Sequence, residues 1–333
     1  MLDGSVPPGA YAIGRIFCEP LTYREAEARI DGFVDSDRPH LVLTPNMAQV
    51  EQADRSPHLA EAFRSASMAT PDGWPLVAAL RLLGARSART RVTGSDLTPL
   101  LCAPDRRVAI VGGRDDSARL AADELVRRNP RLRVVLVEPV PPAELADPRA
   151  REALVARIAD AGADLIFVGL GVPKQERLAL EVLDALDRGV VLCVGATIEF
   201  IAGTVPRSPL WMQRLGVEWL HRTLRDPRSM AKRYVTSLPT FVWHVAGALR
   251  AGAAARRRTG AGSTGAGDSA QVLRNGWWLV LAGAAGGFGV ALMMTLAAAS
   301  LRAEDWIDLA LGMVVGALAG LGLAVLRSRY VHG

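Results

Sequence analysis

The chain has 333 residues and a formal net charge of +5, with 50% hydrophobic and 22% charged residues. This length suits two domains, or one large domain with appendages, and excludes a disulfide-stapled miniprotein. The cysteines stand far apart without a CxxC pair or a Cys/His cluster, so we expect reduced thiols and no structural zinc at Cys18, Cys102 and Cys193. An aromatic content of 5% argues against nucleic-acid binding, despite the basic charge.

The first part of the chain predicts a cytoplasmic α/β domain. Residues 1–10 lack the basic flank and apolar core of a secretory signal. From there to residue 203, β-type runs alternate with helix-type segments, which predicts a Rossmann-like, mostly parallel sheet with flanking helices. The expected strands are 40–44, 107–111, 133–137, 165–168 and 190–194, and the expected helices are 23–35, 116–128, 147–161 and 174–186.

Polar residues and turn formers follow the early strands of this domain. Strand 40–44 ends in Thr44-Pro45-Asn46, which exposes a hydroxyl and an amide on a turn. Further on, Asp72 precedes Gly73 in a Pro/Gly turn, where a carboxylate either forms the turn or acts as a base. Because open α/β sheets bind ligands at the carboxyl ends of their strands, these residues are candidates for a site.

Three later strands end in glycines on the same sheet edge. Strand 107–111 runs into Gly112-Gly113, whose backbone amides could face a phosphate. Strand 165–168 runs into a loop with Gly169 and Gly171, then a helix that starts with three polar side chains, Lys174, Gln175 and Glu176. Strand 190–194 ends at Gly195. No GxGxxG fingerprint or Walker motif occurs here, so these loops predict a nucleotide-sugar site that is neither a dinucleotide fold nor a P-loop.

The composition changes after residue 203. Residues 204–249 hold seven basic residues against two acids and read as a basic amphipathic appendage, either a solvated helix packed on the sheet or a surface that meets anionic lipid or a diphosphate. Residues 250–274 read as a flexible linker with the basic cluster Arg256-Arg257-Arg258.

Two apolar stretches within 275–329 predict a transmembrane helical hairpin. The arginines before and after it and the acidic loop 302–308 place both ends in the cytoplasm by the positive-inside rule. The glycines Gly312, Gly316 and Gly320 repeat GxxxG, which leaves homo-oligomerisation open. We therefore expect a cytoplasmic-membrane protein that contacts membrane lipid.

An ordered set of short motifs resembles the WecG/TagA/CpsF family of bacterial glycosyltransferases over residues 10 to 240. The most specific parts are Pro-Lys-Gln-Glu at 173–176 and Glu-Trp-x-x-Arg at 218–222. The other matching segments are Thr44-Pro45-Asn46, Pro71-Asp72-Gly73, Gly94-Ser95-Asp96, Val111-Gly112-Gly113, Gly169-Leu170-Gly171, Gly195-Ala196, Ala202-Gly203 and Arg207-Ser208-Pro209.

The resemblance implies a UDP-sugar-dependent hexosyltransferase or N-acetylhexosaminyltransferase. Such enzymes move a sugar, often of the N-acetylmannosamine type, onto a polyprenyl-diphosphate-linked saccharide for cell-surface polysaccharide or teichoic acid-type synthesis. It also implies that Asp72 is the catalytic base and that Thr44, Asn46 and Gln175 line the site. The basic appendage would close over the site at the membrane; Arg222 and Arg233 fit its pattern, while Ser229 stands where many members have arginine and Arg228 precedes it.

The residue types suit this chemistry, since transfer needs a base for the acceptor hydroxyl and cations for the charge that develops on UDP. Arginines 222, 228 and 233 would hold either that leaving group or the lipid diphosphate. We expect inversion, as the family implies, no cofactor, and transfer without a metal, taking the chain to contain no Asp-x-Asp metal motif. The alternative is a noncatalytic nucleotide-sugar scaffold or sensor in a membrane glycan assembly complex; a nicotinamide-dependent oxidoreductase lacks its fingerprint.

Overall fold

The computed structural model describes residues 6–209, 212–213, 218 and 227–258. Contacts divide the chain into two units, and the first contains residues 1–218 and 236–261. The sheet, its helices and the carboxyl-terminal part of the last described helix belong to this unit.

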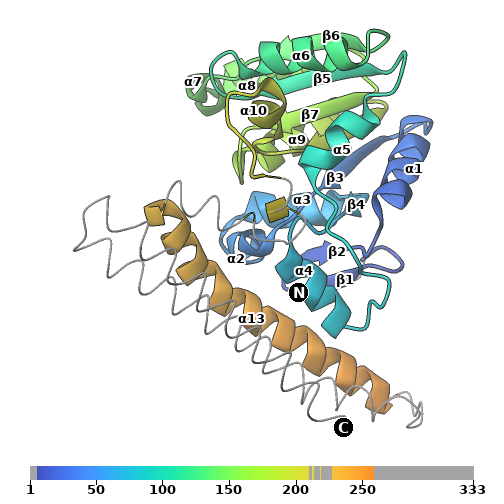
Figure 1. Cartoon of the computed structure of the whole chain (residues 1–333), viewed down its shortest axis with the longest axis vertical. Coiled ribbons are helices and arrows are strands. Elements are labelled where there is room, and N and C mark those ends of the chain that lie inside the picture. The colour runs from blue at the N-terminus through green and yellow to red at the C-terminus, as the bar shows by residue number, and fades with distance from the viewer. Residues whose placement is uncertain (1–5, 210–211, 214–217, 219–226, 259–333) are drawn as a thin grey trace. The chain divides into compact units, whose positions relative to one another are not determined.

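Six parallel strands form the central sheet in the order β4-β3-β8-β7-β5-β6 (Figure 1). This confirms the expected α/β class, and the five predicted strands agree with the structure to within one residue at each end. A sixth strand of two residues extends one edge, and a short antiparallel hairpin, β1 (Tyr11–Ile13) with β2 (Ile16–Cys18), precedes the sheet. The sheet strands are β3 (Pro39–Leu43), β4 (Met68–Ala69), β5 (Arg107–Gly112), β6 (Arg133–Glu138), β7 (Leu165–Gly169) and β8 (Gly189–Cys193).

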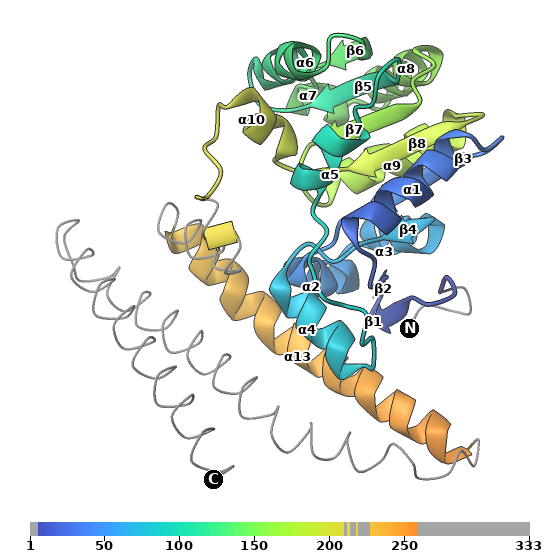
Figure 2. The same cartoon turned by 45° about the vertical axis from the view of Figure 1, so that its right-hand side comes forward.

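Helices cover both faces of the sheet (Figure 2). One face is packed by α1 (Tyr23–Val34), α5 (Gly94–Leu101), α6 (Ser117–Arg128) and α10 (Thr197–Ala202). The other carries α3 (Pro57–Ser65) and α9 (Lys174–Ala185), with α8 (Pro148–Asp160) against α9. The remaining helices are α2 (Met47–Arg55), α4 (Trp74–Leu82) and α7 (Pro142–Ala146).

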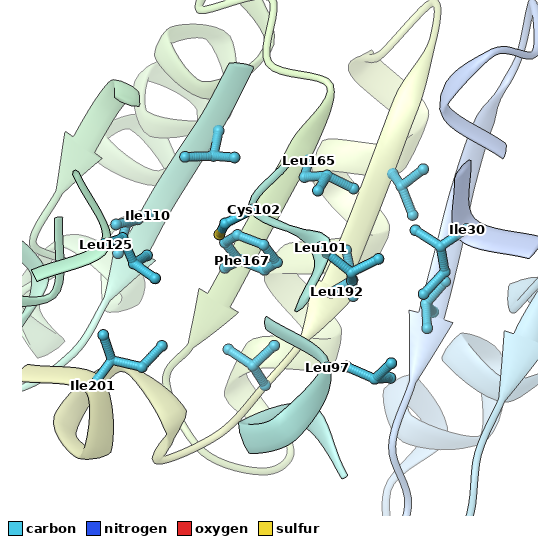
Figure 3. Packing of buried hydrophobic residues seen from close by; sticks show 14 of the residues in the cluster. Ile30, Leu97, Leu101, Cys102, Ile110, Leu125, Leu165, Phe167, Leu192 and Ile201 are labelled. Carbon is cyan, nitrogen blue, oxygen red and sulfur yellow. The ribbon is translucent and has the colours of Figure 1, made fainter. Parts of the chain in front are cut away.

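A hydrophobic core lies under the first of these faces. Alternate residues of the central strands point into it, among them Ile110, Leu165, Phe167 and Leu192 (Figure 3). They meet apolar side chains from the covering helices, such as Ile30, Leu97, Leu101, Leu125 and Ile201. Since both faces are buried, the strands read as continuous apolar runs rather than as alternating ones.

The helix α13 (Pro227–Arg258) crosses the expected boundary between the appendage and the linker. Residues 250–258, expected to be flexible, continue the helix, because alanine and arginine in Ala-Gly-Ala-Ala-Ala-Arg-Arg-Arg favour helical backbone. In the part of this helix that belongs to the first unit, His244 pairs with Asp54 of α2 at 2.7 Å, and Phe241 and Val245 are buried.

The predicted hairpin at 275–329 lies outside the described residues. Within residues 6–258, apart from the undescribed positions, no helix combines the length and the apolar character that a membrane crossing requires.

Candidate active site

The carboxyl ends of the parallel strands bring the predicted site residues to one edge of the sheet. Reading along the strand order, the loops are 70–73 after β4, 44–46 after β3, 194–196 after β8, 170–173 after β7 and 113–116 after β5. Every one of the loops singled out from the sequence therefore lies on this edge, and hydrogen bonds tie these loops to one another or to the neighbouring strand ends and α9.

Asp72 lies directly beside the loop that follows β3. Its backbone N–H donates to the carbonyl oxygen of Pro45 at 2.7 Å, and two residues earlier the Thr70 N–H donates to Leu43 at 3.0 Å. Gly73 has a φ of 141°, a region that favours glycine, so the turn after Asp72 depends on that residue. The half-buried Asp72 is thus held by its backbone beside Pro45, the residue between Thr44 and Asn46.

Thr44 and Asn46 have local structural partners as well. The Thr44 hydroxyl donates to the Cys193 carbonyl at 3.3 Å, which links the ends of β3 and β8. Asn46 is the N-cap of α2: its side chain accepts from the Ala48 N–H at 3.0 Å, and Gln49 accepts from the Asn46 N–H at 2.9 Å. This capping box explains locally why α2 begins after Asn46.

Gln175 and Glu176, at the start of α9, are buried under the same loops. The Gln175 carbonyl oxygen accepts from the Gly195 N–H at 3.0 Å, and its amide donates to Glu176 Oε1 at 2.9 Å. Gln49 donates to the same oxygen at 3.1 Å. Burial raises the pKa of Glu176 to about 7, against the lowering effect of the hydrogen bonds from Gln175, its own backbone and Gln49.

Glu176 was expected to bind substrate, and in this structure its side chain is fully buried. The residue has no exposed surface, so it offers no direct contact from its present position. Glu176 is buried because it lies in the first turn of α9, on the side that faces the sheet, next to the buried Cys193. Burial, and to a smaller extent the charge of Glu176, raises the pKa of the Cys193 thiol.

The glycines after β5 and β7 meet at the centre of this edge. The chain leaves β5 toward β6 through α6 and leaves β7 toward β8 through α9, so the two loops diverge, which is where open α/β sheets bind ligands. The Gly113 N–H donates to the Gly169 carbonyl at 2.8 Å, and a Cβ on Gly112 would lie 2.5 Å from that oxygen. A Cβ on Gly169 would lie 2.7 Å from the Gly195 carbonyl.

These contacts occupy two of the backbone amides at this edge, including one expected to face a phosphate. The N–H groups of Gly113 and Gly195 are engaged by Gly169 and Gln175, so in this structure they are not directed at a phosphate. The glycines 112, 113 and 169 allow close packing of neighbouring loops. By contrast, Gly171 and Lys174 are exposed at the N-terminus of α9, in the loop with the cis Val172–Pro173 bond.

A second polar network joins three of the matching motifs. Arg207 donates to both Asp96 oxygens, at 2.6 and 3.0 Å, and lies 3.9 Å from Glu218, which also pairs with Arg91 at 2.8 Å. Tyr23 donates to Asp96 as well, at 2.8 Å. Burial alone would raise the pKa of Asp96, but the hydrogen bonds and the charge of Arg207, with the hydroxyls of Tyr23 and Thr93, hold it below its usual value.

A comparison with protein families matches this chain to the model described as "Glycosyl transferase WecG/TagA/CpsF family" over residues 12–255. The chain belongs to the WecG/TagA/CpsF glycosyltransferase family. It is therefore a glycosyltransferase, and the matched region contains the sheet, the loops at its carboxyl edge, and the described part of α13 up to residue 255.

The three arginines predicted for this glycosyltransferase lie outside the first unit or outside the described residues. Arg222 lies outside the described residues. Arg228 and Arg233 lie in the first turns of α13, within the part of that helix assigned to the second unit. Their roles toward a diphosphate stay predictions.

One Asp-x-Asp triplet does occur in the chain, so the assumption made from the sequence needs a correction. Asp35-Ser36-Asp37 follows α1 and precedes β3, whereas Thr44 follows that strand. The triplet thus lies at the opposite edge of the sheet, roughly 16 Å away by the rise of a five-residue strand. Among the described residues, no three His, Cys, Asp or Glu side chains gather as a metal site would require.

Reasoning from residue types alone missed Gln49, Arg91 and Tyr23. Gln49 follows Asn46 by three residues, a capping-box spacing that could have identified it. Arg91 and Tyr23 reach Glu218 and Asp96 across 127 and 73 positions of sequence, and no local pattern signals such contacts.

Proposed function

We propose that this glycosyltransferase moves a sugar from a UDP-sugar to a polyprenyl-diphosphate-linked saccharide, with Asp72 as the base. The donor sugar would be of the N-acetylmannosamine type or a related hexose, and the product would serve cell-surface polysaccharide or teichoic acid-type synthesis. The observation that carries the proposal is the row of hydrogen-bonded loops that gathers Asp72, Thr44, Asn46 and Gln175 at the carboxyl edge of the sheet.

The reaction is a displacement at the anomeric carbon. Asp72 removes the proton from an acceptor hydroxyl, the oxygen attacks the anomeric carbon from the face opposite UDP, and the bond to the diphosphate breaks. Inversion follows from this single displacement. Thr44, Asn46 and the exposed Lys174 lie where a sugar or a diphosphate could be bound, and the loops after β5 and β7 diverge beside them.

The negative charge that develops on UDP requires cationic partners. We assign this role to the arginines at 222, 228 and 233, whose guanidinium groups match phosphate oxygens and could hold the acceptor's diphosphate instead. The reaction as proposed uses no metal or cofactor.

The apolar stretches at 275–329 support a location at the cytoplasmic membrane, with the catalytic domain on the cytoplasmic side. A lipid-linked acceptor lies in the same membrane, so an anchored enzyme meets it at a raised effective concentration.

The test is UDP release by the full-length protein in detergent. Each of a panel of UDP-sugars is supplied with and without a short-chain polyprenyl-diphosphate-linked N-acetylglucosamine. Release that depends on the acceptor and on one donor supports the proposal and identifies the sugar. UDP binding without release across a panel of lipid-linked acceptors would favour the scaffold reading instead.

A further inference from the structure

The carboxylate of Glu176 joins two glutamines from different helices. Its Oε1 atom accepts hydrogen bonds from Gln175 at 2.9 Å and from Gln49, on α2, at 3.1 Å. Both bonds are buried. This oxygen accepts both bonds when the carboxylate is ionised, and also as the carbonyl oxygen of the acid when Oε2 is protonated, so each glutamine turns its NH₂ group toward Glu176.

This requirement fixes the opposite atom of each glutamine amide. With its NH₂ group on Glu176, Gln175 presents its carbonyl oxygen to the Gly195 N–H in the loop after β8, at 3.0 Å. Gln49 likewise presents its carbonyl oxygen to the Asn46 N–H in the loop after β3, at 2.9 Å. One buried acceptor thus determines the orientation of two amides that hold two neighbouring site loops.

Packing alone does not explain an acidic residue at this position. The second carboxylate oxygen of Glu176 is buried without a hydrogen-bond partner among the described residues, and burial raises the pKa of the group to about 7. A buried, half-satisfied carboxylate destabilises a fold relative to an apolar residue of similar volume. A residue that lowers the stability of the fold in this way fits a role in the site better than a role in packing.

We propose that Glu176 is a positioning residue of the transferase: it orients Gln175 and Gln49 and so sets the spacing between the loops at 44–46 and 194–196. Glu176 acts through these glutamines and does not touch the substrate. The inference rests on the proposed function, because it assumes that the sugar is transferred between these loops.

Activity variants of the full-length protein test this role. Glu176→Met keeps the volume but removes the acceptor, and we expect kcat/KM for the donor to fall about tenfold or more, since misplaced site groups reduce transfer strongly. Glu176→Gln keeps a carbonyl acceptor and should restore most of that loss. The matched control is Glu181→Gln on the same helix, whose carboxylate pairs with Arg151 and Arg177, and it should change kcat/KM by less than about twofold.

A double-mutant cycle separates positioning from general destabilisation. If Glu176 acts through Gln175 and Gln49, then Glu176→Met should have little further effect on kcat/KM in a background that carries both Gln175→Ala and Gln49→Ala. The proposal would be overturned if the losses of kcat/KM in the separate variants multiplied when the substitutions were combined. It would also be overturned if Glu176→Met were as active as the wild type.

Hydrogen exchange in the wild type provides a measurement that needs neither activity nor a folded variant. In protein labelled with ¹⁵N-glutamine, the side-chain NH₂ groups of Gln49 and Gln175 should exchange at least about tenfold more slowly than that of free glutamine, because both are buried donors. Fast exchange of both would contradict the network. A wild type that releases no UDP with any donor would defeat the proposed function, while slow exchange in that same protein would still support the orientation of the glutamines.

Discussion

The backbone N–H of Asp72 donates a 2.7 Å hydrogen bond to the carbonyl oxygen of Pro45. This single bond joins two loops that are 27 residues apart in sequence and places the proposed base next to Thr44 and Asn46. Since it is made by backbone atoms, it survives substitution of the Asp72 side chain. Changes to that carboxylate can therefore be read as changes in chemistry rather than in loop position.

Asn46 has two roles that substitution can separate. Asn46→Ala removes the N-cap of α2 and should lower the free energy of unfolding by about 1 kcal/mol. Asn46→Asp keeps a capping oxygen and should retain stability, yet lower transfer if the amide binds the sugar. Urea unfolding and UDP release measure the two effects. Equal activity of Asn46→Asp and wild type would remove Asn46 from the list of substrate contacts.

The raised pKa of Glu176 makes stability depend on pH. The carboxyl is protonated in the folded protein up to a pKa of about 7 and in the unfolded chain only up to 4.5. Its favourable contribution is complete below pH 4.5, declines as pH rises, and is lost above pH 7, by about 3 kcal/mol in total. Glu176→Gln does not titrate, so the stability of the wild type relative to this variant should fall between pH 5 and 8. A constant difference across that range would contradict the assignment.

The Arg207–Asp96 pair should stabilise the segment that leaves α10. Arg207→Lys removes the bidentate hydrogen bonds with Asp96. We therefore expect the free energy of unfolding to fall by about 1 to 2 kcal/mol. Asp96→Asn should give a similar loss, and the double variant should lose less than the sum. Thermal unfolding of the four proteins measures this coupling, and strictly additive losses would argue against a direct pair.

The apolar C-terminal region is predicted to serve as an anchor. A shortened chain ending at Arg258, the last residue of α13, should retain activity on a short-chain, water-soluble acceptor. On a long-chain acceptor in vesicles it should be at least about tenfold slower than the full chain, because the effective concentration at the membrane is lost. Loss of activity on both acceptors would indicate a structural role for the region instead.

The sequence was sufficient for the parts of the fold that depend on long periodic segments. Strands such as 165–168 are continuous apolar runs because both faces of the sheet are buried, and helices such as 174–186 carry a clear apolar stripe. The short elements escaped prediction: β4 has only two residues, and α5 begins at Gly94 and contains Pro99, which hide its helical pattern.

The sequence predicted that the candidate residues share one edge of the sheet, but not which of them are buried. Because all six strands are parallel, loops that end strands must share an edge, and Thr44, Asp72, Gln175 and Gly195 do. Burial is a tertiary property, and so the sequence could not show that Glu176 faces the sheet while Lys174, two residues earlier, is exposed. The contacts of Arg91 and Tyr23 likewise require the folded chain.

The most direct test of the account compares Asp72→Asn with Asp37→Asn in the acceptor-dependent UDP-release assay. Removing the base should lower kcat by about 100-fold or more, while UDP binding is unchanged. Asp37, exposed in the Asp-x-Asp triplet at the opposite edge of the sheet, should tolerate the same change with full activity. Near-wild-type turnover by Asp72→Asn, with UDP binding intact, would contradict the assignment of the base.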